Sequence, residues 1–207
     1  MENYNDGNEK KYLSKNALKQ YMIKHFLQKL LKVIEECRGN DEEMSVLDVG
    51  CGEGFVANFL YDNVKGLKIT AVDYFDEAIN KAKNDNKRNI SFLKGDIYHL
   101  NYAGDTFDMV MATEVLEHLD NPDEALRELV RAAKKYVVIT VPNEPFFCLG
   151  NLLTGKNVKR LGNPIDHVNH WTYFGFEKFI KKNLSHVKLR KYNLFVWTLV
   201  VIEKNVA

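Results

Sequence analysis

SVLDVGCGEG, residues 45–54, is an apolar run that passes directly into a glycine-rich turn, and a helix is predicted to begin at Phe55. A strand, a glycine turn and a helix in this order are typical of nucleotide-binding units, because glycines let a ligand approach the backbone closely. The spacing here is G-x-G-x-G, whereas a dinucleotide fingerprint has its third glycine one position later, at Phe55. Asp48 would repel a pyrophosphate beside this turn, and it suits a ligand with ammonium and sulfonium charges instead.

Short β-rich runs alternate with helical segments after this turn. The further predicted strands are KITAVD (68–73), ISFLKG (90–95), FDMVMA (107–112) and YVVITV (136–141). Predicted helices begin at Phe55, Asp76 and Pro122, and the last is expected to carry Lys134 and Lys135 in its final turn. Strands that alternate with helices indicate βαβ units. The sequence therefore predicts an α/β fold with a parallel sheet covered on both faces.

Both ends of the chain carry further structure. Apolar residues recur at three- and four-residue steps from Ala17 to Cys37, which predicts an amphipathic helix inside an N-terminal helical cap, residues 1–40. Residues 143–173 have no regular pattern but are rich in aromatic and aliphatic side chains, and we interpret them as a lid or substrate loop. A helix (FGFEKFIKKNL, 174–184) and two strands (186–193 and 194–204) follow, the strands as an antiparallel hairpin. No repeat or linker divides the chain, so we expect one domain, residues 1–207.

Charge and cysteine content narrow the classes of function. The 29 basic and 28 acidic residues leave a net charge of +1, so any site for nucleic acid or an anionic membrane has to be local. Three cysteines without a C-x-x-C pair suit a reducing compartment, and we expect a cytoplasmic protein. No apolar run approaches the roughly 18–20 residues of a membrane span, and the N-terminus lacks a secretory signal pattern.

Two further strand ends add carboxylates and apolar side chains. Asp73 ends the second predicted strand, about 20 residues after the glycines, where a carboxylate can accept ribose hydroxyls, and Tyr74 beside it could stack on adenine. Asp96 could accept the adenine amino group while Ile97 packs on the ring. Since the carboxyl ends of parallel strands meet at one edge of a sheet, these residues are expected to form one ligand site.

The stretches VLDVGCGEG, ITAVDYFDEAI, LKGDIYHL, FDMVMATEVLEHLDNP and YVVITVPN together resemble the class I S-adenosylmethionine-dependent methyltransferases, in particular the group that includes ubiquinone-pathway O-methyltransferases. The resemblance implies a single Rossmann-like, doubly wound domain. Its seven-stranded sheet has the order 3-2-1-4-5-7-6 with the last strand antiparallel. It also implies the following cofactor contacts: the methionine end against Gly50, Cys51, Gly52 and Gly54, the ribose on Asp73, the adenine on Asp96 and Ile97, and Thr113 and Glu114 beside the methyl group.

The implied activity is methyl transfer from S-adenosylmethionine to an oxygen or nitrogen of a small, partly apolar acceptor, with S-adenosylhomocysteine as product. In-line displacement requires above all that the acceptor atom is held in line with the methyl group. An alcohol or phenol acceptor also benefits from a base that removes its proton. His118 is the leading candidate, followed by His167 and His170. Two of them also have a structural interpretation: His118 could pack beneath the cofactor, and His170 could anchor the loop.

Two alternatives stay open. Glu114, Glu117 and His118 form an E-x-x-E-H pattern, whose i, i+3 and i+4 spacing predicts that they share one face of a helical turn. With His167 or His170 they resemble the metal site of RNA 3′-terminal ribose 2′-O-methyltransferases, although the arginine-rich motif of those enzymes is missing. We therefore predict no metal in the primary interpretation and no nucleic-acid partner. The second alternative is a catalytically silent module that binds S-adenosylmethionine.

Overall fold

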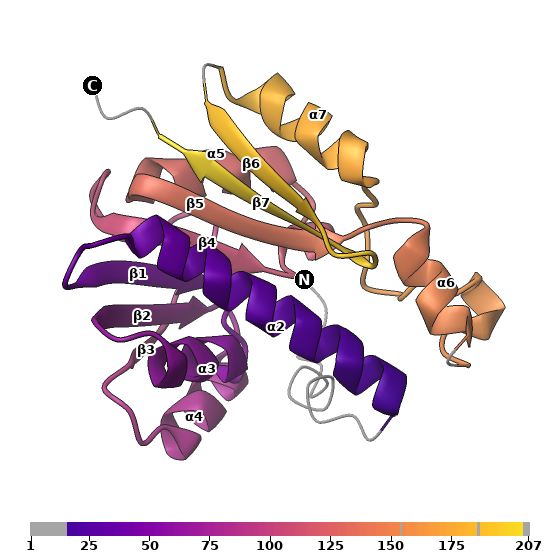
Figure 1. Cartoon of the computed structure of the whole chain (residues 1–207), viewed down its shortest axis with the longest axis horizontal. Helices are drawn as coiled ribbons and strands as arrows, with labels where there is room; N and C mark the ends of the chain where they lie inside the picture. Colours follow the sequence, from indigo (N-terminus) through magenta and orange to yellow (C-terminus); the bar gives the residue numbers. More distant parts are fainter. Residues whose placement is uncertain (1–15, 154, 186, 205–207) are drawn as a thin grey trace.

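The computed structural model describes residues 16–153, 155–185 and 187–204, so residues 1–15 of the predicted N-terminal cap and His186 of the predicted hairpin lie outside the described residues. One seven-stranded sheet runs through the molecule in the order β3-β2-β1-β4-β5-β7-β6 (Figure 1). Its strands are β1 (Met44–Val49), β2 (Leu67–Asp73), β3 (Ser91–Lys94), β4 (Phe107–Thr113), β5 (Ala133–Pro142), β6 (Lys188–Asn193) and β7 (Trp197–Glu203). β7 is antiparallel to both β5 and β6, while the pairings among β1 to β5 are parallel. The predicted strand order and the antiparallel last strand are confirmed.

Helices cover both faces of this sheet. They are α2 (Ala17–Arg38), α3 (Phe55–Asn63), α4 (Asp76–Asp85), α5 (Pro122–Ala132), α6 (Phe146–Leu153) and α7 (Tyr173–Asn183), with the short 3₁₀ turns η1 (Leu116–His118) and η2 (Val158–Arg160). Side chains alternate along each strand. In β4, Met109 and Met111 therefore join the core beneath α2, α3 and α4, while Val110 and Ala112 join the core beneath α5 and α7.

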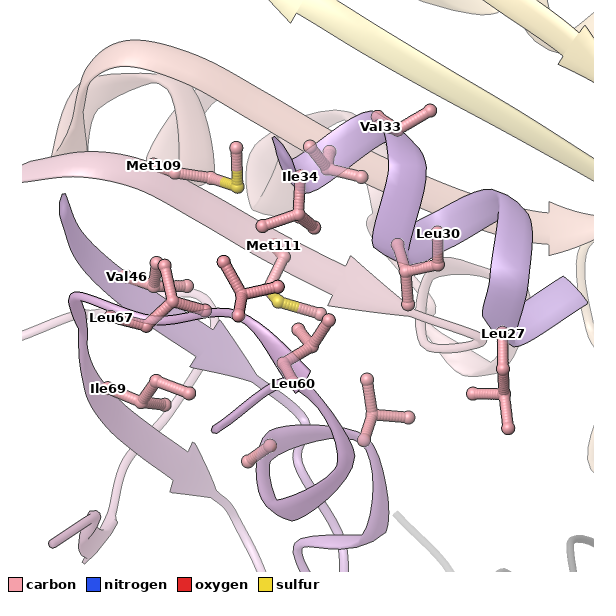
Figure 2. Close-up of a cluster of buried hydrophobic side chains, with 14 of the residues drawn as sticks. Leu27, Leu30, Val33, Ile34, Val46, Leu60, Leu67, Ile69, Met109 and Met111 are labelled. Atoms are coloured by element: carbon pink, nitrogen blue, oxygen red, sulfur yellow. The ribbon is translucent and has the colours of Figure 1, made fainter. Parts of the chain in front are cut away.

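The long helix α2 lies across one face of the sheet (Figure 1). Its buried stripe includes Leu27, Leu30 and Ile34, which meet strand residues such as Val46 and Met111 (Figure 2). The stripe does not extend to the start of the helix: Leu18 and Tyr21 are 57% and 70% exposed. The predicted helix is confirmed, and its buried residues begin at Ile23.

The end of α5 differs from the prediction. The helix stops at Ala132, and Lys134 and Lys135 belong to β5. The cations at its C-terminus are Arg131 in its last turn and Lys204, whose Nζ donates to the carbonyls of Val130 and Ala133. Lys204 therefore takes the place at the helix C-terminus that was predicted for Lys134 and Lys135, since it donates to carbonyls at that end. Lys135 instead pairs with Asp41 at 2.8 Å.

The segment 143–173 contains the helix α6 and the turn η2 rather than irregular chain alone. In Figure 1, α6 lies beyond the strand ends, away from the sheet. Among the described residues, no helix is long and apolar enough to cross a membrane.

Candidate active site

The turn between β1 and α3 depends on its glycines. Gly50, Gly52 and Gly54 have φ angles of 74°, 54° and 80°, which side-chain-bearing residues rarely adopt. A Cβ on Gly50 would lie 2.5 Å from Val115 Cγ2, and one on Gly54 would lie 2.6 Å from the Phe92 ring. The turn is held by β2, because the N–H groups of Gly50 and Cys51 both donate to the Val72 carbonyl. Burial raises the pKa of the Cys51 thiol well above its usual range, so this side chain is an inert, neutral lining.

Asp48 lies beneath this turn and is only 1% exposed. Its carboxylate oxygens accept no hydrogen bond from the part of the chain that the structure describes. Burial, with the nearby Asp73 carboxylate as a smaller cause, raises its pKa to about 7. A buried carboxylate without a partner is costly, so this position is prepared for a cationic group.

Asp73 joins the glycine turn to the end of β2. Its Oδ2 accepts from the Gly52 N–H at 2.7 Å, and its Oδ1 accepts from the Phe75 N–H at 3.0 Å. Burial raises its pKa, and the backbone N–H donors oppose that shift. Each carboxylate oxygen retains a lone pair, so these bonds leave room for ribose hydroxyls. Tyr74 next to it is exposed, with its ring edge-on to Phe75.

The end of β3 lies next to Asp73, whose carbonyl accepts from the Gly95 N–H at 2.9 Å. Asp96 follows, and its Oδ1 accepts from the Tyr98 N–H, which fixes the carboxylate in a tight turn. Ile97 is buried in the core. The structure therefore brings the expected ribose and adenine residues to one edge of the sheet.

Glu114 follows β4 with a φ of 58°, a rare value for a non-glycine residue. Its N–H donates to Thr140, and its Oε2 accepts from the Trp197 indole N–H at 2.8 Å. Thr113 is buried just before it. Trp197 was missed by sequence reasoning, because it reaches Glu114 only through the pairing of β5 with β7.

Two of the three candidate histidines meet. The rings of His118 and His167 lie edge to face with centroids 4.9 Å apart, and Phe147 stacks on His167 at 5.3 Å. His118 Nδ1 lies 2.9 Å from the Asp166 carbonyl oxygen, and His118 Nε2 lies 3.9 Å from Glu117 Oε1. His170 is exposed, and its Nε2 lies 3.3 Å from Asn163 Nδ2.

The predicted face shared by Glu114, Glu117 and His118 does not form. Only Leu116–His118 are helical, and the positive φ of Glu114 directs that residue to Trp197 instead. One ligand atom each from Glu117, His118 and His167 lies within 4.8 Å of the other two. The structure therefore gathers three of the residues considered for a metal, without Glu114.

Residues 166–169 are fixed against η1 by main-chain bonds. The N–H groups of Val168 and Asn169 both donate to the Glu117 carbonyl, and Asn169 Nδ2 donates to the carbonyls of Leu116 and Leu119. Asn169 and Asp166 were also missed by sequence reasoning. An asparagine within H-V-N-H carries no signal of its own, since its role depends on a contact some 50 positions away.

These residues fit S-adenosylmethionine. The Asp48 carboxylate, which accepts no hydrogen bond within residues 16–153, 155–185 and 187–204, and the acceptor-rich strand ends match a ligand with two positive charges and two ribose hydroxyls. Because its glycines carry no side chain, the turn lets a ligand approach the backbone closely.

The sheet order, the glycine turn and the acidic strand ends define a class I S-adenosylmethionine-dependent methyltransferase domain. Residues 47–139 match the family described as "Methyltransferase domain", which confirms the family resemblance.

Three comparisons illustrate the range of similar proteins. The ubiquinone biosynthesis O-methyltransferase of Rickettsia bellii (strain OSU 85-389) is 30% identical over 111 residues, which cover 52% of this chain and 45% of that protein. The malonyl-[acyl-carrier protein] O-methyltransferase of Halalkalibacterium halodurans is 27% identical over 130 residues, which cover 58% of this chain and 48% of that protein. The solved structure of the plantazolicin methyltransferase BpumL with a monoazolic desmethylPZN analog and SAH has a TM-score of 0.74 at 17% identity, and the match covers 97% of this chain and 91% of that one. The match thus spans about half the length of these curated relatives, while the fold match extends over nearly the whole chain.

Proposed function

We propose that this protein transfers a methyl group from S-adenosylmethionine to an oxygen, or else a nitrogen, of a small and partly apolar acceptor. The observation that carries the proposal is the buried Asp48 carboxylate, which accepts no hydrogen bond from the described residues and lies beneath the glycine turn. A carboxylate in this position favours a sulfonium and ammonium ligand over a phosphate-bearing one. O-methyltransferases among the relatives support oxygen as the acceptor atom.

The cofactor assignment follows the strand ends. Gly50, Cys51, Gly52 and Gly54 would line the methionine end, and Asp48 would balance its positive charge. Asp73 would accept the ribose hydroxyls, with Tyr74 over the adenine ring. Asp96 and Ile97 would bind the adenine edge and face, and Thr113 with Glu114 would lie beside the methyl group.

The bound cofactor supplies an electrophilic methyl carbon, so the protein has to align the acceptor and manage its proton. A backbone carbonyl only accepts hydrogen bonds, so the Asp166 carbonyl beside Nδ1 assigns the ring proton of neutral His118 to Nδ1. Nε2 then carries the free lone pair. We assign His118 as the base that would take the proton of the acceptor hydroxyl at Nε2 as that oxygen is methylated.

His167 would support His118 through the edge-to-face ring contact. We leave His170 out of the base assignment, since its ring bonds with Asn163 at the surface. On the acceptor side, Phe147 reaches both His167 and the core, and Phe146 contacts Phe195. These rings support segment 143–173 as a lid over an apolar acceptor, with α2 beside it.

The test combines binding and turnover. S-adenosylhomocysteine binding is measured by calorimetry, and methyl transfer is measured with a panel of apolar phenols and amines. Asp73→Asn should weaken binding at least about tenfold, since it removes a charged acceptor of two bonds. Asp62→Asn, at an exposed ion pair with Arg88, is the matched control and should bind normally. His118→Gln should keep binding and lose about a hundredfold in kcat on phenols. Tight binding with no turnover on any acceptor would favour the silent module.

The cluster of Glu117, His118 and His167 supports a second candidate, metal-dependent methylation of a ribose hydroxyl at an RNA 3′ end. Under this alternative, His118 Nε2 would coordinate a cation rather than take a proton. Thermal unfolding with S-adenosylhomocysteine, with and without Mn²⁺ or Mg²⁺, separates the two. Stabilisation by metal that Glu117→Gln abolishes and His170→Ala retains would favour the RNA enzyme, and no metal effect would favour the small-molecule enzyme.

A further inference from the structure

Exposed apolar side chains concentrate on segment 146–168, outside the cofactor edge. Leu149 and Leu153 are one helical turn apart on α6, so they share a face, and Leu153 is 76% exposed. None of the eight residues of α6 is buried. A helix this short depends on packing, which Phe147 supplies on one side, so the exposed leucines on the other side are available for contact with a partner.

The apolar surface continues past α6. Val158, Leu161 and Ile165 are all exposed, Leu161 at 78%. Leu161 also has a φ of 52°, a strained conformation for a bulky residue. The chain thus holds a leucine side chain in water at a backbone position that favours glycine or asparagine.

The same segment carries mainly positive charge. Lys156, Lys159 and Arg160 are exposed, and the acidic residue of segment 146–168 is Asp166, whose carboxylate lies 3.5 Å from His118 Nδ1. This is the local basic site that a chain of net charge +1 needs in order to hold an anionic surface. Exposed leucine, valine and isoleucine interleaved with lysine and arginine suit the boundary between lipid headgroups and acyl chains. A single-stranded nucleic acid would favour free aromatic rings for stacking, whereas the aromatic rings of this segment, Phe146 and Phe147, already contact Phe195 and His167.

The exposed apolar and basic surface lies at one end of the molecule (Figure 1). α6 lies beyond the strand ends, on the side of the molecule where α2 begins (Figure 1). Phe147, on the same helix, packs against the core and stacks on His167. One side of α6 therefore faces the proposed acceptor site while Leu149 and Leu153 face outward.

We infer that segment 146–168 docks on an anionic lipid bilayer, with its leucines in the interface and its cations on the headgroups. In the class of membrane-surface proteins, one apolar anchor with one basic patch gives reversible binding, and the two signals act together. The inference does not depend on methyl transfer, but it would explain how an apolar acceptor reaches the lid from the lipid phase.

The experiment is flotation of the full chain, saturated with S-adenosylhomocysteine, with vesicles of phosphatidylcholine alone or with about one third phosphatidylglycerol. We expect binding to the anionic vesicles at least about tenfold stronger than to the neutral ones, and weaker at high salt. Leu153→Glu and Lys159→Glu should each reduce this binding about tenfold. Leu93→Glu, at a 44% exposed position on the edge strand β3, is the matched control and should bind like the unmodified chain.

Stabilisation by S-adenosylhomocysteine is recorded for every variant, so that loss of the cofactor site is distinguished from loss of docking. Failure of the unmodified chain to float with anionic vesicles would overturn the inference while leaving the proposed methyl transfer intact. Equal losses in Leu93→Glu and Leu153→Glu would also overturn it. So would binding of an RNA oligonucleotide in preference to the vesicles.

Discussion

Asn143 Oδ1 accepts a hydrogen bond of 2.9 Å from the Tyr173 N–H, across 30 positions of the chain. Asn143 Nδ2 donates to the Phe195 carbonyl at 2.8 Å, and the side chain is buried. Next to it, the Glu144 N–H donates to the Trp171 carbonyl. The two ends of segment 143–173 are thus joined at one buried amide, and the segment is a closed loop with a defined neck.

Asn143→Ala should open this neck. The change leaves the Tyr173 N–H and the Phe195 carbonyl, both in partly buried hydrogen bonds, without their partner, so we expect a loss of about 1–3 kcal/mol in the free energy of unfolding. Amide hydrogen exchange should accelerate in residues 144–172 more than in β1 or β4. Asn183→Ala, which removes a single side-chain bond at the end of α7, is the control and should leave lid exchange unchanged.

The central sheet and the cofactor edge could be predicted from the sequence because their signals are local. Strand periodicity, the G-x-G-x-G turn and the acidic residue after each strand are all readable within a few positions. The neck and the histidine pair are different, since Asn143 and Tyr173, or His118 and Asp166, meet only after the sheet has formed. The shared face predicted for Glu114, Glu117 and His118 was wrong because the i, i+3, i+4 rule applies only within a helix. The positive φ of Glu114 places that residue outside any helix.

Gly50→Ala should damage the cofactor turn more than backbone strain alone would. Its Cβ would lie 2.5 Å from Val115 Cγ2, in addition to the strained φ of 74°. Gly39→Ala is the matched control, because Gly39 also has a positive φ but its Cβ would meet nothing within 4 Å. We expect a loss of about 1 kcal/mol for Gly39→Ala and at least about 2–3 kcal/mol for Gly50→Ala in urea unfolding.

Only the Gly50 variant should also lose affinity for S-adenosylhomocysteine. Equal losses of stability and affinity in both variants would show that φ, not the approach of Val115, makes this glycine necessary.

Trp197→Phe should separate packing from hydrogen bonding at Glu114. A phenyl ring preserves much of the contact with Phe26, whose ring centroid lies 5.1 Å from that of Trp197, but it removes the N–H that Glu114 Oε2 accepts. We expect about 1–2 kcal/mol less stability and a several-fold weaker affinity for S-adenosylmethionine. Trp171→Phe, in the aromatic cluster with Phe176 and Phe179, is the control and should change stability without changing affinity.

Asp48→Asn should change the pH dependence of both binding and stability. The pKa of Asp48 is raised to about 7 in the folded protein without cofactor, so its carboxyl is protonated below that pH. Because the folded state binds this proton more tightly than the unfolded state does, protonation stabilises the fold. This contribution to the free energy of unfolding is fully present below about pH 4 and is lost as the pH rises through 7. A cationic ligand needs the ionised form, so the affinity for S-adenosylmethionine should rise as the pH rises from 6 to 8.

The asparagine variant cannot ionise. Without cofactor, it should be more stable than the unmodified protein by about 2–4 kcal/mol at pH 8, and this difference should fall to about 1–2 kcal/mol at pH 5. Its affinity for S-adenosylmethionine should be lower and nearly flat across the same pH range. Thermal unfolding and calorimetry at pH 5, 6, 7 and 8 measure both effects on the same samples. An affinity that rises with pH equally in both proteins would assign the titration to another group and remove Asp48 from the cofactor site.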